Sequence, residues 1–320
     1  MRTARAPRGA SVRCRRASLS TTTSRNMQSS SWSDHAAKYA NNGNGLTLPL
    51  LLAALAHITP ALDALAAQRA PQPLRILTTC GGPGVEAVLL CKHFGGKHVN
   101  ILSTDNAEGM VQLARDSFEK EGLQDIAEAR VLDAMKLDLP DQSYDAVLQL
   151  LGPMLLPDAR ASFAEATRVL TPGGVFCALT PGRMVIHDVM TSAKRGVLEK
   201  AGRGDEFQDL YSHRIMSEWG TPPKLKEQLE KCSAFAKVEA ANAPAEMPVS
   251  SEAHLDEILQ SLWDNPGMAF MYTSNLSEEQ VAEFRAAVRK EMLKRRAESG
   301  KETWGAEMLG NVVCAWTAEK

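Results

Sequence analysis

The chain has 320 residues, of which 44% are apolar and 23% are charged, and its formal net charge is −2. These values are close to the average of globular proteins, so they exclude a wholly disordered, collagen-like or coiled-coil chain. The near-neutral charge and an aromatic content of 5% also argue against a nucleic-acid-binding protein, which needs a basic field or a base-stacking surface.

The N-terminal stretch differs in composition from the rest of the chain. Residues 1–26 hold seven Arg, many Ser and Thr, and no acidic residue. This is typical of a mitochondrial transit peptide, but also of a disordered tail or of an upstream extension with Met27 as the true start. We expect residues 1–31 to be such a tail or targeting segment, and the protein to be cytoplasmic unless residues 1–26 are a transit peptide. The apolar run 46–58 contains Pro49 and is too short to span a bilayer, so we expect a core or lid helix and no membrane partner.

Helical and strand patterns alternate from residue 47, and the alternation weakens from residue 183. The predicted strands cover 74–79, 99–103, 129–132, 144–150, 175–179, 235–241 and 308–316. The predicted helices cover 47–68, 85–94, 107–121, 159–170, 184–200, 222–232, 251–263 and 277–298. Alternation at this spacing is typical of βαβ units, and right-handed crossovers turn such units into a doubly wound, mostly parallel sheet.

We therefore predict an α/β fold with one domain over residues 32–320. Its core is expected at 70–182, a substrate or lid region at 183–305, and a closing strand at 306–317. Six cysteines, none in a C-x-x-C pair, predict reduced thiols of an intracellular protein and no metal site.

Glycine and polar side chains stand at the ends of successive predicted strands. Gly82 and Gly84 follow the first strand, Asp105 the second and Asp133 the third, and Gln149 stands at the end of the fourth. Ligands of open α/β sheets bind outside the carboxyl ends of the strands, where glycine admits a ligand to the backbone. A carboxylate at Asp105 can accept both hydroxyls of a ribose, and one at Asp133 can accept an adenine amino group. The pattern predicts a nucleotide site.

Each of these signals alone has a plainer interpretation. A glycine cluster before a helix is often only a turn, Asp105 can cap the next helix, and Asp133 can be a surface turn residue. Gly82-x-Gly84-x-x-Ala87 also fits the dinucleotide fingerprint, so an NAD(P)-dependent oxidoreductase is the first alternative. It is disfavoured because the sequence has no Tyr-x-x-x-Lys pair for a hydride-transfer site.

The motifs resemble those of class I S-adenosylmethionine-dependent methyltransferases, and within that class the small-molecule type 11 group related to the ubiquinone/menaquinone C-methyltransferases. The resemblance covers residues 32–181, with a looser tail to 320. It rests on the N-terminal segment 32–39, the glycine-rich loop 76–84, the ribose-binding segment 103–106 with Met110 and Ala114, the adenine-contacting pair Asp133-Ala134, the strand start 144–147 and the turn 168–174. It implies a Rossmann-like sheet of seven strands, mostly parallel with the last strand antiparallel, and a helical insertion or lid.

The resemblance also implies the cofactor, S-adenosylmethionine, and the residues that bind it. These are Tyr39, Thr78, Cys80, Gly82, Gly84, Asp105, Asn106, Met110, Asp133, Ala134 and Gln149. Two of them depart from the family pattern, because Thr78 stands where an acid is usual and Cys80 where glycine is usual. The acid normally helps to order the methionine end of the cofactor, so neutral Thr78 is expected to lower cofactor affinity. These departures keep open a second alternative, a non-catalytic binding module with a methyltransferase fold.

The implied reaction is in-line transfer of the sulfonium methyl group to an oxygen, nitrogen or carbon atom of a small-molecule substrate. A general base is needed only for an acceptor that must lose a proton. His187, His213 and Tyr211 are candidate bases, and no catalytic residue is predicted. The apolar stretch 149–152 favours an apolar acceptor, and the apolar cluster 263–272 is either a lid over it or ordinary core. The oligomeric state stays open.

Overall fold

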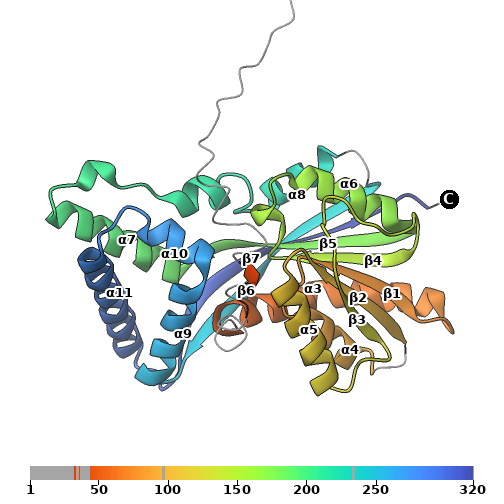
Figure 1. Ribbon diagram of the computed structural model, residues 1–320, viewed down its shortest axis with the longest axis horizontal. Coiled ribbons are helices and arrows are strands. Elements are labelled where there is room, and N and C mark those ends of the chain that lie inside the picture. Colours follow the sequence, from red (N-terminus) through yellow and green to blue (C-terminus); the bar gives the residue numbers. More distant parts are fainter. Residues whose placement is uncertain (1–31, 34–35, 37–43, 96–97, 233–234, 320) are drawn as a thin grey trace, which may run out of the picture.

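The computed structural model describes residues 32–33, 36, 44–95, 98–232 and 235–319. The strands are β1 (Leu74–Thr79), β2 (Val99–Asp105), β3 (Ala127–Val131), β4 (Tyr144–Leu150), β5 (Leu170–Met184), β6 (Lys237–Val249) and β7 (Trp304–Trp316). They form one seven-stranded sheet in the order β3-β2-β1-β4-β5-β7-β6 (Figure 1). The pairs among β1 to β5 are parallel, whereas β7 is antiparallel to both β5 and β6. The predicted doubly wound, Rossmann-like sheet with an antiparallel last strand is confirmed.

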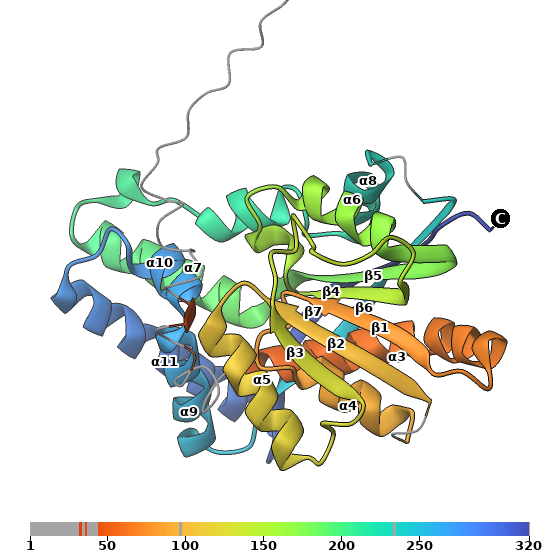
Figure 2. The same ribbon diagram turned by 45° about the vertical axis from the view of Figure 1, so that its right-hand side comes forward.

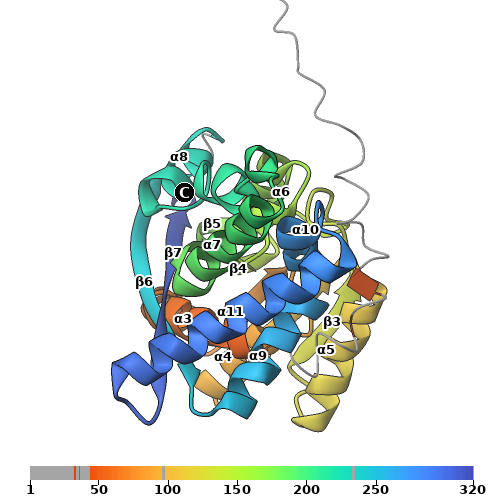
Figure 3. The same cartoon turned by 90° about the vertical axis from the view of Figure 1, so that its left-hand side faces the viewer.

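Helices cover both faces of the sheet. They are α3 (Asn44–Arg69), α4 (Val85–His93), α5 (Glu108–Lys120), α6 (Ala159–Val169), α7 (Val185–Lys200), α8 (Pro222–Glu230), α9 (Glu252–Asp264), α10 (Pro266–Thr273) and α11 (Glu278–Ser299). Figure 1 shows α3, α4 and α5 on one face and α6 and α8 on the other. The helices α7, α9, α10 and α11 gather at one end of the sheet, which faces the viewer in Figure 3. Because α7 follows β5 directly, this is the end where the parallel strands terminate and where such sheets bind ligands.

Buried apolar residues recur at every fourth position along one side of α3. Leu50, Ala54, Ile58 and Leu62 are buried, and α3 packs on β5, β6 and β7. Within the described ranges, α3 is also the one helix that is long and apolar enough to cross a membrane. The buried stripe is the one expected of a core helix, since an apolar stripe at helical spacing faces the interior of a globular protein.

Three strands run further than the sequence predicts. β5 has 15 residues, and β6 and β7 have 13 residues each. β5 continues past Leu179, which pairs with the last residue of β4, Leu150. β6 contains Pro244 and Pro248, although proline has no N–H to donate to a neighbouring strand. β6 accommodates both because it is the edge strand of the sheet.

The helix α10 was not predicted from the sequence. Asn265 begins it, and the side chain of this residue accepts the Met268 N–H (3.0 Å). Trp263 packs edge to face on Phe284 of α11, and Tyr272 stacks on the same ring. Tyr272 is buried and Trp263 is half-buried, so these two residues of the apolar cluster 263–272 belong to the packed interior of the helical end of the molecule.

A buried carboxylate joins several elements at the opposite end of the sheet. The Asp145 side chain is 3% exposed and is paired with the guanidinium groups of Arg69 (3.0 Å) and Arg75 (2.9 Å). It also accepts the Arg75 backbone N–H (2.9 Å) and the Thr171 hydroxyl (3.3 Å). These bonds tie the end of α3 to the starts of β1, β4 and β5. A buried charge is stable only with such partners.

Replacing Asp145 by alanine removes the carboxylate and leaves two guanidinium groups without their partner. Breaking a buried ion pair costs about 3–5 kcal/mol, and we expect the lower end of this range in urea denaturation because Arg69 and Arg75 are 32% and 35% exposed. Asp63→Ala is the matched control, since it removes an exposed ion pair with His93 and is expected to cost about 0–1 kcal/mol. Equal losses in the two variants would contradict the assigned role of Asp145.

Candidate cofactor site

The loop between β1 and α4 contains three residues in the left-handed region. Cys80, Gly82 and Gly84 have φ values of 55°, 51° and 75°. The Gly81 N–H donates to the Thr104 carbonyl of β2 (2.9 Å), so the loop lies across the carboxyl ends of β1 and β2. Figure 2 shows α4 and α5 beside this part of the sheet. The first turn of α4 follows the loop, and its free N–H groups are available to a ligand there.

Glycine is required at Gly82 and at Gly84 for different physical reasons. A Cβ at Gly84 would lie 2.9 Å from Cε1 of Phe118 on α5 and 3.1 Å from the Cβ of Ala114. At Gly82, nothing lies within 4 Å of such a Cβ. Gly84 therefore permits the loop to pack closely on α5, whereas Gly82 leaves the outer side of the backbone open to a ligand.

Asp105 ends β2 and is bonded to the glycine loop. Its Oδ2 accepts the Gly82 N–H (3.0 Å), and its Oδ1 accepts the Ala107 N–H (2.9 Å). Burial raises the pKa of Asp105, and the hydrogen bonds from the Ala107 and Gly82 N–H groups oppose the rise. Each carboxylate oxygen has two lone pairs, so each keeps an acceptor position for a further donor. Two adjacent hydroxyls, such as those of a ribose, match this arrangement.

Thr78 lies under the loop rather than on an open surface. Its side chain is buried, and its hydroxyl oxygen lies at hydrogen-bond distance (3.0 Å) from the Ser103 hydroxyl of β2. It also forms a hydrogen bond with the carboxyl group of Glu86, which is buried in the first turn of α4. The sequence analysis missed Glu86, because an acid in the first turn of a helix is the ordinary match to the helix dipole and indicates no site by itself.

Cys80 and Gln149 contact each other where β1 and β4 end. Gln149 Nε2 donates to the Cys80 Sγ over 3.8 Å, and Gln149 Oε1 accepts the Ser162 hydroxyl (3.3 Å). A Cβ at Gly152 would lie 2.6 Å from the Cβ of Cys80, so only glycine fits there. Burial, and then the charge of Asp105, raises the pKa of the Cys80 thiol. A protonated thiol is a poor nucleophile, so Cys80 shapes the loop and does not react.

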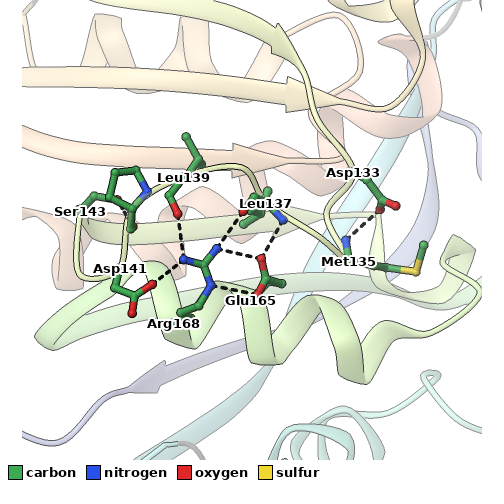
Figure 4. A network of polar contacts seen from close by, with 9 residues as sticks. Asp133, Met135, Leu137, Leu139, Asp141, Ser143, Glu165 and Arg168 are labelled. Carbon is green, nitrogen blue, oxygen red and sulfur yellow. Dashed lines mark hydrogen bonds and ion pairs between the residues drawn. The ribbon is translucent and has the colours of Figure 1, made fainter.

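Arg168 of α6 holds the segment that follows β3. It donates to the carbonyls of Leu137 and Leu139 (2.8 Å each), and it pairs with Glu165 and Asp141 (Figure 4). Glu165 in turn accepts the Leu137 N–H (2.7 Å). The arginine of the predicted turn 168–174 therefore acts as a clamp on the β3–β4 connection.

Asp133 begins the segment that Arg168 holds. It is exposed, and its Oδ1 accepts the Met135 N–H (2.9 Å), while Ala134 beside it is buried. The carboxylate thus shapes the turn, as in the plainer interpretation, and its remaining lone pairs are free for an amino group. The structure is compatible with both interpretations of Asp133.

The N-terminal segment lies against α5 next to Asp105. The Ser33 hydroxyl accepts the Gly109 N–H (3.2 Å), and Ala36 packs with Met110 in a small apolar cluster. Met110 is buried, and Asn106 is exposed at the start of the turn. Tyr39, the predicted binding residue of this segment, lies outside the described residues.

The three candidate bases lie beyond the end of β5. His187 Nδ1 is 2.5 Å from the Tyr272 hydroxyl, and burial lowers its pKa to about 3, so its ring is neutral. Tyr211 stacks on His187 and donates to the Gly182 carbonyl (2.6 Å). His213 is exposed. These contacts assign no general base, and across the described ranges no group of three His, Cys, Asp or Glu side chains is placed to hold a metal ion.

Two glycine variants separate backbone strain from the close packing at the loop. Gly84→Ala and Gly122→Ala both place a side chain at positive φ, which costs about 1–2 kcal/mol. Only at Gly84 does the new Cβ meet Phe118, whereas at Gly122 nothing lies within 4 Å. We expect a larger loss of thermal stability for Gly84→Ala, measured by calorimetry. A loss no greater than that of Gly122→Ala would show that the loop does not depend on this contact.

Comparison with known proteins places this geometry in a family. Residues 76–174, which contain the loop, Asp105 and Asp133, match the model of the family described as Methyltransferase domain. The chain is 27% identical over 135 residues to the demethylmenaquinone methyltransferase of Bacteroides fragilis. The aligned segment covers 41% of this chain and 54% of that protein. It is 38% identical over 96 residues to a sterol 24-C-methyltransferase of Gibberella zeae. This alignment covers 30% of this chain and 24% of that protein. The matches thus span about half the length of these relatives or less.

Solved structures also align with the chain. They include the [4+2]-cyclase SpnF, with a TM-score of 0.49 and 19% identity over 81% of each chain. Another is the Haemonchus contortus phosphoethanolamine N-methyltransferase 2 in complex with S-adenosyl-L-methionine, with a TM-score of 0.44 and 17% identity over 82% of this chain and 53% of that one. The family and relative matches do not favour the oxidoreductase or the non-catalytic module. Residues 76–174 of this chain therefore match a methyltransferase domain, and the relatives support the class I S-adenosylmethionine-dependent type.

Proposed function

We propose that this protein transfers the methyl group of S-adenosylmethionine to a small, apolar metabolite by in-line displacement. The observation that carries the proposal is the Asp105 carboxylate, which the Gly82 and Ala107 N–H groups orient while each oxygen keeps a free acceptor position. The open outer side of the backbone at Gly82 is the second support, because a ligand can approach it without a side chain in the way.

The chain's residues have separate tasks in this reaction. When bound, S-adenosylmethionine supplies an electrophilic sulfonium methyl group, so the protein need not provide a nucleophile. Asp105 would hold the ribose hydroxyls, the backbone around Gly82 the amino-acid end, and the Asp133-Ala134 pair the adenine. Fixing two reactants in line contributes about 7–11 kcal/mol to the lowering of the barrier. Alignment is therefore the main catalytic contribution.

The proposed acceptor is apolar because of the residues where β4 ends. Leu150 and Pro153 are buried there, Leu151 is partly buried, and Gly152 touches Cys80 of the loop. Small-molecule sites are lined mainly by apolar side chains with a few polar groups. The names of the two relatives, which refer to a demethylmenaquinone and a sterol, also favour an apolar acceptor.

For the cellular location we propose the cytoplasm, with mitochondrial import as the alternative. The alternative is supported by the seven Arg and the absence of acids in residues 1–26. Mapping the mature N-terminus of the endogenous protein by mass spectrometry distinguishes them, because cleavage at about residues 20–30 is expected only with import.

Calorimetric titration with S-adenosylmethionine tests the function directly. We expect micromolar binding by the full chain, and a loss of at least about 100-fold in Asp105→Ala, since two charge-assisted hydrogen bonds of about 1.5–3 kcal/mol each disappear. Asp116→Ala is the control, because Asp116 is an exposed carboxylate on α5 and should leave binding unchanged. Heat with NAD(P) and none with S-adenosylmethionine or its demethylated product would overturn the proposal in favour of an oxidoreductase.

A further inference from the structure

Glu86 is a buried carboxyl group directly beneath the glycine loop. Glu86 lies in the first turn of α4 and is 5% exposed. A Cβ at Gly81 would lie 2.9 Å from Glu86 Oε1, 2.8 Å from Thr78 Oγ1 and 2.6 Å from Ser103 Oγ. Three polar atoms from α4, β1 and β2 therefore surround one point of the loop, and Gly81 has no side chain because they occupy that space.

The surroundings of Glu86 contain hydrogen-bond donors but no cation in the described part of the chain. The groups that face it are the hydroxyls of Thr78 and Ser103, the thiol of Cys80 and the carboxylate of Asp105. Burial raises the pKa of Glu86 to about 7, and the charge of Asp105 adds to the rise, while hydrogen bonds from Thr78 and its own N–H oppose it. A buried carboxylate without a cationic partner is costly, so ionised Glu86 favours any positive charge that arrives at the loop.

We infer that Glu86 is a positioning residue for the positively charged end of the cofactor, and that it acts through the loop at Gly81. This inference rests on the proposed function, because S-adenosylmethionine brings a sulfonium and an ammonium group to the loop. Thr78 is neutral, and the carboxyl group beside it comes from Glu86 of α4. The departure at Thr78 therefore does not leave the loop without a negative charge.

The charge state of Glu86 gives the inference a signature in pH. Binding of a cation favours ionised Glu86, so a pKa near 7 in the free protein falls on binding and a proton is released. Cofactor affinity should rise about tenfold between pH 5.5 and 7, with about half a proton released at pH 7. The amino group of the ligand titrates near pH 8, but it does so identically with every variant and cancels in their comparison.

The test compares wild type with Glu86→Gln by calorimetry with S-adenosylmethionine, in buffers of different ionisation enthalpy. Glu86→Gln keeps the shape of the side chain and should still bind, but with an affinity that changes less than twofold over the same pH range and no proton release near pH 7. Glu119→Gln, an exposed acid on α5, should behave like wild type. The double variant Thr78→Asp/Glu86→Gln should recover affinity at pH 7, because Thr78 Oγ1 borders the same point as the Glu86 carboxyl.

The outcomes separate this inference from the proposed function. If wild type does not bind S-adenosylmethionine, the proposed function fails. If wild type binds and Glu86→Gln retains its pH dependence and proton release, the function stands and the role of Glu86 is wrong. Folding is checked by thermal unfolding at pH 8. There Glu86→Gln should be more stable than wild type, because the stability that neutral Glu86 contributes is lost as the pH rises through its raised folded-state pKa.

Discussion

The hydrogen bond from the Gly82 N–H to the Asp105 carboxylate is the constraint on which the site depends. It fixes the loop after β1 against the end of β2, two strands that are neighbours in the sheet. The same carboxylate accepts the Ala107 N–H and so also sets the start of α5. One side chain therefore joins the loop that leads into α4 to the start of α5. A ligand that bonds to its remaining lone pairs meets a site that is already formed, which reduces the entropy lost on binding.

The site is negatively charged, and this character explains several separate observations. Burial raises the pKa of the Cys80 thiol, and the charges of Asp105, Asp133 and Glu86 add to the rise. Such a concentration of acids costs folding free energy, and a ligand that carries positive charge offsets part of this cost. A sulfonium cofactor fits this site better than a dinucleotide, whose phosphates would be repelled. The electrostatics thus agree with the family match, which rests on sequence alone.

Much of the fold and part of the site could be predicted from the sequence, for physical reasons that differ between residues. Gly82, Gly84 and Asp105 were found because backbone conformation and strand-end position leave a local pattern. The length of β6 could not be predicted. Pro244 and Pro248 are tolerated in a strand only at the edge of a sheet, and the edge position of β6 is a property of the whole sheet. Glu86 was missed because its partners Thr78 and Ser103 are distant in sequence and meet only after β1 and β2 pair. Tyr39 lies outside the described residues, so its predicted role stays a prediction.

A crystal structure of the full chain with S-adenosylhomocysteine would examine the central claim most directly. The account predicts that both ribose hydroxyls lie within hydrogen-bond distance, about 2.5–3.0 Å for O–H···O bonds, of the two oxygens of Asp105, with the amino-acid end over Gly82. A nucleoside bound elsewhere on the sheet would contradict it. So would an Asp105 carboxylate whose free lone pairs are taken by protein groups in the complex.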